Sequence, residues 1–133
     1  MTEGGGSAFD VLARAFGDAY NRRDADGLAA LCEPDVEFHP SLMVGRRATY
    51  LGHAGIRRWV EELAQAPIQA RGRVTEVRPL GERRFMVIAD MLEDGKLLLA
   101  ISWAVRVGES GLIAEAYGHL GVADDAQIVR DQS

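Results

Sequence analysis

Four extended segments joined by short turns fill the second half of the chain, and this pattern limits the possible folds most. The segments cover residues 69–78, 84–93, 96–107 and 112–120 and are separated by turn residues. One of the turns, Asp94-Gly95, is a strong signal for a two-residue hairpin. Because such short connections join antiparallel neighbours, the sequence predicts a four-stranded antiparallel meander.

The first half shows helical periodicity instead. Apolar residues recur at spacings of three and four from Phe9 to Tyr20, which predicts a helix that starts near Ser7. A shorter helix is predicted over 26–31 and a third over 54–66. All three helices therefore precede the meander.

A short strand is predicted at 36–39, where apolar and polar residues alternate before Pro40. Three helices and one strand before a meander exclude a doubly wound parallel sheet. They predict an α+β fold with the helices on one sheet face. With 133 residues, the chain fits a single domain, expected over 8–121 between a flexible glycine-rich tail at 1–7 and a C-terminal tail at 122–133.

Composition excludes several classes of protein. A net charge of −5 disfavours a general nucleic-acid binder, which needs a basic face. The longest apolar run, 97–105, is about half of the ~20 residues that a membrane helix needs. Cys32 is the only cysteine, and the start of the chain does not read as a signal peptide. We therefore expect a cytoplasmic protein that does not bind membranes.

Three segments carry a resemblance to a known family. They are AYNRRD at 19–24, LCEPDVEF at 31–38 and YLGHAGIRRW at 50–59. With the meander, they resemble the SnoaL-like branch of the nuclear transport factor 2-like superfamily, with its ketosteroid isomerase-like fold, over 9–121. The resemblance implies a cone-shaped, strongly curved mixed sheet with the helices on its concave face and a pocket for a small apolar molecule.

Three polar residues are candidates for chemistry. The resemblance places His39 where ketosteroid isomerase-like relatives carry their acid/base carboxylate, and an imidazole also titrates near neutral pH. Asp90 is expected to face the pocket as its partner. Tyr20 replaces, one turn later, a hydroxyl that relatives place at the position of Phe16. The alternatives are a structural histidine, a solvated aspartate at the rim and a core tyrosine.

The predicted pocket lining is apolar. By the resemblance it consists of five residues: Phe16, Trp59, Met86, Ile88 and Trp103. Trp103 stands where isomerase-like relatives place an acid that holds the substrate oxygen, and an indole donates no proton at neutral pH. A ketosteroid isomerase reaction is therefore not expected.

The opposite sheet face is predicted to form a homodimer. In the register that the resemblance implies, Glu115, Tyr117 and His119 point outward beside the small residues Ala100, Ser102 and Ala104. The three histidines of the chain have no metal-site spacing, so neither a metal nor another cofactor is expected.

Two hypotheses for function remain open. One is a cofactor-independent acid/base isomerase, cyclase or hydrolase that acts on a small hydrophobic compound of polyketide, terpenoid or steroid type. The alternative is a non-catalytic ligand-binding or dimerisation module on the same fold.

Overall fold

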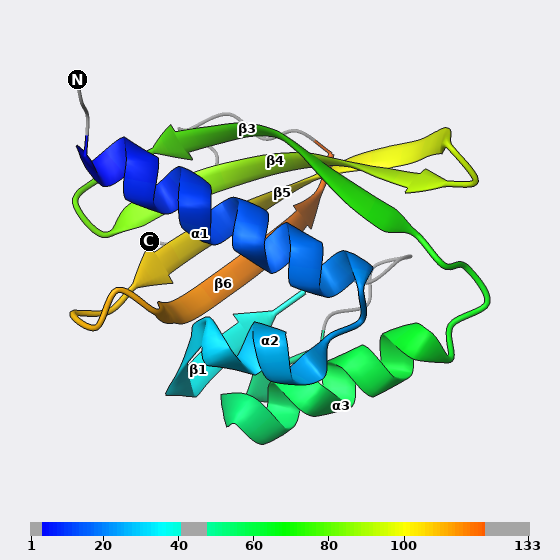
Figure 1. Ribbon diagram of the computed structural model, residues 1–133, viewed down its shortest axis with the longest axis horizontal. Helices are drawn as coiled ribbons and strands as arrows, with labels where there is room; N and C mark the ends of the chain where they lie inside the picture. The colour runs from blue at the N-terminus through cyan, green and yellow to red at the C-terminus, as the bar shows by residue number, and fades with distance from the viewer. Residues whose placement is uncertain (1–3, 41–47, 122–133) are drawn as a thin grey trace.

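The computed structural model describes residues 4–40 and 48–121, and Figure 1 shows their arrangement. The helices and strands follow in chain order: α1 (Gly4–Asn21), α2 (Ala25–Ala30), β1 (Cys32–His39), β2 (Tyr50–Leu51), α3 (Gly52–Ala64), β3 (Arg71–Pro79), β4 (Arg84–Glu93), β5 (Lys96–Val107) and β6 (Ile113–Leu120).

One mixed six-stranded sheet organises the domain, in the order β2-β1-β6-β5-β4-β3. Strands β3 to β6 form the antiparallel meander, and β1 adds to it in parallel with β6. The α+β prediction is therefore confirmed, as is the meander. In the Asp94-Gly95 turn both residues have positive φ angles, 52° and 78°, as expected of a two-residue hairpin turn.

Three features of the structure differ from the prediction. Strand β1 begins at Cys32, so it contains Pro34, and its register with β6 shifts between Cys32 and Glu37. Proline has no N–H to donate to a neighbouring strand. It is tolerated at this position because the pairing of β1 with β6 is irregular there. Strand β2 is too short to leave a sequence pattern. Helix α1 begins at Gly4 and so includes part of the predicted tail; the predicted tail residues 1–3 and 122–133 lie outside the described residues.

The three helices lie on one face of the curved sheet, which we call the inner face (Figure 1). Helix α1 crosses β3, and α3 packs on β1. The core between helices and sheet contains Leu28, Phe38, Ile56 and Phe85, all of which are essentially inaccessible to solvent. Burial of these apolar side chains is the main force that holds the helices on the sheet.

A second, smaller cluster lies on the opposite face, which we call the outer face. It consists of Met86, Ile88 and Ala104, with Leu80 and Tyr117 packed against it. Both faces of the middle strands are thus buried. None of the described helices is long and apolar enough to cross a membrane.

Replacing Phe38 with alanine is expected to destabilise the domain by about 3–5 kcal/mol. The ring is fully buried, and its removal leaves a cavity among other rings. Urea unfolding followed by circular dichroism measures the change. Val11→Ala, at a position 66% exposed on α1, is the control and should stay within about 0.5 kcal/mol of wild type. A loss below about 1 kcal/mol for Phe38→Ala would contradict this account of the core.

Candidate functional site

Five aromatic side chains meet on the inner face, and we call them the inner aromatic cluster: Phe16 and Tyr20 from α1, Phe38 from β1, Trp59 from α3 and Trp103 from β5. The Phe38 ring centre lies 4.5 Å from that of Trp59 and 5.1 Å from that of Trp103. Tyr20 lies 5.7 Å from Trp59. These distances are typical of favourable ring contacts, so the cluster packs as one unit.

The cluster extends from the core to the molecular surface. Phe38 and Trp59 are buried, at 0% and 4% exposure, whereas Phe16, Tyr20 and Trp103 are only partly buried. Part of each of these three side chains is therefore accessible to solvent at the edge of the core.

Tyr20 carries the one hydroxyl group of the cluster. Desolvation by burial raises its pKa, and the nearby Arg23 guanidinium, 4.7 Å from the ring centre, only partly opposes this effect. Arg23 is itself held by hydrogen bonds to the carbonyl oxygens of Tyr20 and Ala70. At neutral pH the Tyr20 hydroxyl is therefore protonated and can donate a hydrogen bond.

The predicted orientation of Met86, Ile88 and Asp90 toward the helices is wrong. These residues share one face, as alternation predicts, but it is the outer face. The neighbouring Phe85 faces inward, where its ring stacks on Phe9 at 4.5 Å. Trp103, by contrast, packs against the inner core.

A β-bulge explains why Trp103 and Met86 lie on different faces. A two-residue turn pairs Glu93 with Lys96, and a regular ladder would continue to pair Met86 with Trp103. The register shifts beyond Leu92, where Leu98 is the extra residue of β5, so Met86 pairs with Ala104 instead. One inserted residue thus moves the rest of β5 to the opposite orientation.

Asp90 and His39 do not meet. Asp90 forms an ion pair of 2.9 Å with Arg73, its cross-strand partner on β3. His39 lies on β1, three strands away from β4 in the sheet. Because Phe38 points inward, its neighbours Glu37 and His39 point outward. The direct His39–Asp90 contact that an acid/base relay requires is therefore absent.

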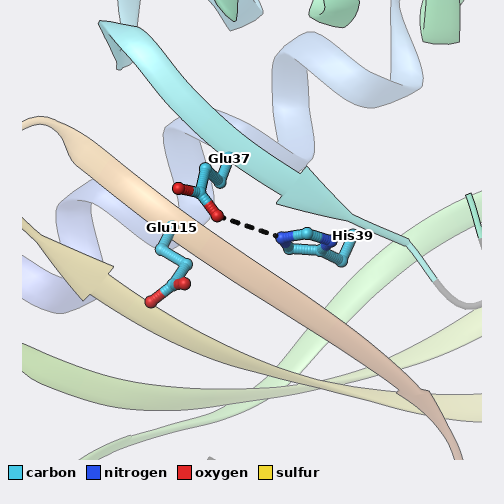
Figure 2. A group of neighbouring side chains, drawn as sticks. All are labelled: Glu37, His39 and Glu115. Carbon is cyan, nitrogen blue, oxygen red and sulfur yellow. Dashed lines mark ion pairs between the residues drawn. The ribbon is translucent and has the colours of Figure 1, made fainter. Parts of the chain in front are cut away.

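His39 belongs instead to a group of polar side chains on the outer face, shown in Figure 2. Its Nε2 atom lies 3.6 Å from a carboxylate oxygen of Glu37, and its Nδ1 atom lies 3.1 Å from Oγ1 of Thr49. The imidazole ring stacks on Tyr117 at 4.4 Å. We call Glu37, His39, Glu115 and Tyr117 the outer polar cluster.

Glu115 is the second carboxylate of this cluster. It accepts a hydrogen bond of 3.0 Å from the Tyr117 hydroxyl and one of 3.3 Å from Nε of Arg106. Desolvation raises the pKa of Tyr117, and the carboxylates of Glu115 and Glu37 raise it further. Tyr117 therefore stays protonated and serves as a donor to Glu115.

Sequence reasoning missed Phe38 and Glu37 as site residues. Both belong to β1, whose alternation was visible, but their importance depends on the parallel pairing of β1 with β6. That pairing places Glu37 opposite Glu115 and His39 opposite Tyr117.

Two surface hollows lie outside both clusters, one beside Arg83 and Arg106 and the other between α2 and α3.

Comparisons with solved structures support the fold. A proposed ketosteroid isomerase from Kribbella flavida matches with 22% identity and a TM-score of 0.67, covering 90% of this chain and 82% of its own. A proposed isomerase of the SnoaL-like family from Agrobacterium tumefaciens matches with 16% identity and a TM-score of 0.73, covering 87% and 99%.

A computationally designed 17-OHP binder matches with 16% identity and a TM-score of 0.63, covering 84% of this chain and 89% of its own. The comparison with curated proteins gave no significant match. At these identities the structural similarities concern the fold. The family comparison matches residues 13–130 to the SnoaL-like domain. With its helices on one face of a curved mixed sheet and this match over most of its length, the chain belongs to the SnoaL-like domain family.

Proposed function

We propose that this protein binds a small, flat, largely apolar molecule against the inner aromatic cluster. The observation that carries the proposal is the partial exposure of Phe16, Tyr20 and Trp103 around the buried Trp59. Small-molecule sites are typically apolar and aromatic with a few placed polar groups. Here the polar group is the Tyr20 hydroxyl.

The chemistry of the cluster favours a ligand with a hydrogen-bond acceptor at its edge. Phe16 and Trp103 are partly exposed rings against which a planar molecule would stack, and their centroids lie 6.4 Å apart. The neutral Tyr20 hydroxyl would donate to a carbonyl or ether oxygen. The similar structures described as a proposed ketosteroid isomerase and as a designed 17-OHP binder support a ligand of this kind.

Binding is favoured over acid/base catalysis by what the cluster contains. Its five side chains include no carboxylate and no imidazole. His39 and Asp90, the two predicted proton-transfer residues, are directed to the outer face. The raised pKa makes Tyr20 a donor and not a base at neutral pH. An isomerase, cyclase or hydrolase mechanism would need a base that this cluster does not supply.

Tyr20→Phe is expected to weaken binding of a flat polycyclic ketone by about 2- to 12-fold, the value of one net hydrogen bond. The matched hydrocarbon without the carbonyl should bind the variant and the wild type equally. Trp59 and Trp103 are the two tryptophans of the chain, so intrinsic fluorescence reports directly on the cluster. Tyr117→Phe, on the outer face, is the control. Tryptophan emission that does not respond to any ligand of this class would reject the proposal.

His39→Ala and Asp90→Asn are expected to leave the affinity for the same ketone unchanged, because both side chains lie on the other face of the sheet. The same fluorescence titration measures this. If the ligand is also turned over and both substitutions abolish the turnover, the acid/base hypothesis is supported against ours. Residual turnover in both variants would exclude His39 and Asp90 as its essential proton-transfer pair.

A homodimer through the outer face is also proposed. Ser102 and Ala104 are already buried within the chain, whereas Ala100 beside Asp90 is partly exposed. Ala100→Arg should therefore convert a dimer to a monomer in sedimentation velocity at tens of micromolar. Val11→Arg, on the opposite side of α1 from the core, is the control. A specific interface normally buries about 1,200 Å² or more and should hold the dimer together at this concentration. A wild-type protein that sediments as a monomer would therefore contradict the proposal.

A further inference from the structure

We propose that the outer polar cluster binds a divalent transition metal ion of the Zn²⁺ type. The ligands would be Nε2 of His39 and one carboxylate oxygen from each of Glu37 and Glu115. Figure 2 shows these three side chains on their strands. The site lies on the opposite side of the sheet from the inner aromatic cluster and does not depend on the ligand proposed there.

The backbone brings the three ligands together. Strands β1 and β6 are parallel neighbours, and their register pairs Glu37 with Glu115. His39 follows two residues after Glu37 and therefore points to the same face. The three ligand atoms lie within 4.8 Å of one another. Ligands around a tetrahedral zinc ion are about 3.3 Å apart for bonds of about 2.0–2.1 Å, so small side-chain rotations suffice.

The surroundings of His39 provide an independent reason for a ligand at Nε2. This atom is buried and has no hydrogen-bond partner, although it faces Glu37 across 3.6 Å. Nδ1 is within hydrogen-bond distance of the Thr49 hydroxyl oxygen. When Nδ1–H donates to that oxygen, the Nε2 lone pair is directed toward the carboxylates. A metal-bound histidine is typically oriented in this way by its second nitrogen.

The remaining neighbours hold the ligands in position. The Tyr117 ring stacks on the imidazole at an interplanar angle of 10°, and the Tyr117 hydroxyl donates to Glu115. Each carboxylate oxygen has two lone pairs, so Glu115 can keep this bond and still bind an ion. Nε of Arg106 lies 3.3 Å from a carboxylate oxygen of Glu115, so it partly neutralises the negative charge of the site. We therefore expect the site to bind Zn²⁺ with micromolar and not nanomolar affinity.

The donor set selects the class of metal. An imidazole nitrogen suits zinc, cobalt or nickel, whereas Ca²⁺ and Mg²⁺ prefer oxygen ligands throughout. Three protein ligands leave at least one position open for water, as in zinc sites that take part in chemistry. The sequence predicted no metal site because the ligands come from two strands that are far apart in the sequence and form no local motif.

Calorimetric titration of the chelator-treated full chain with Zn²⁺ tests the proposal. We expect one ion per chain, and at least a tenfold loss of affinity in His39→Ala, Glu115→Gln and Glu37→Gln. Glu37 is 55% exposed, so its replacement should leave the fold intact if the other two do not. The control His119→Ala removes a histidine that lies on β6 and is not one of the three ligands, so this variant should bind Zn²⁺ as the wild type does.

Titration with Co²⁺ gives a second readout. Co²⁺ bound at this site should produce an absorption band in the visible range, and the band should be lost in Glu37→Gln. No binding of Zn²⁺ at 100-fold excess over about 10 µM protein would overturn the proposal. Binding that all three ligand substitutions leave unchanged would overturn it equally. Ketone binding at the inner aromatic cluster is measured separately, so failure of one proposal does not affect the other.

Discussion

Burial of Phe38 is the interaction on which the rest of the structure depends. Its ring contacts rings from α1, α3 and β5, so it joins helices and sheet in one apolar unit. Because side chains alternate along a strand, fixing Phe38 on the inner face also directs Glu37 and His39 to the outer face. Burial of this one aromatic side chain, worth about 3–5 kcal/mol on deletion, thereby favours the outward orientation of Glu37 and His39.

Most of the fold could be predicted because its signals are local. The Asp94-Gly95 turn and the helical spacing from Phe9 to Tyr20 each act within a few residues, and the structure confirms both elements. The features that were missed depend on distant partners. Strand β1 extends back to Cys32 because it pairs there with Ile113, and no pattern near Pro34 reveals this.

The site was harder to predict, since alternation along β4 groups residues by face without identifying the face. Phe85 and Val87 are apolar on one side and Met86 and Ile88 on the other, and both sides are buried. A regular hairpin would have placed Met86 and Trp103 together, as expected from the sequence. The bulge at Leu98 separated them. A shift of one residue is enough to exchange the faces, and a bulge has no reliable sequence signal.

The two faces of β1 and β6 then favour different chemistry. Inward, Phe38 and Ala116 form a pair at the buried core, where a low dielectric penalises charge. Outward, the next pair is His39 with Tyr117, beside two carboxylates that remain partly solvated. Consecutive residues thus belong to an apolar surface and to a polar cluster. The parallel hydrogen bonds between β1 and β6 set the separation of His39 from Glu115, so a ligand that stacks on the inner rings leaves the outer geometry unchanged unless it also shifts β1 against β6.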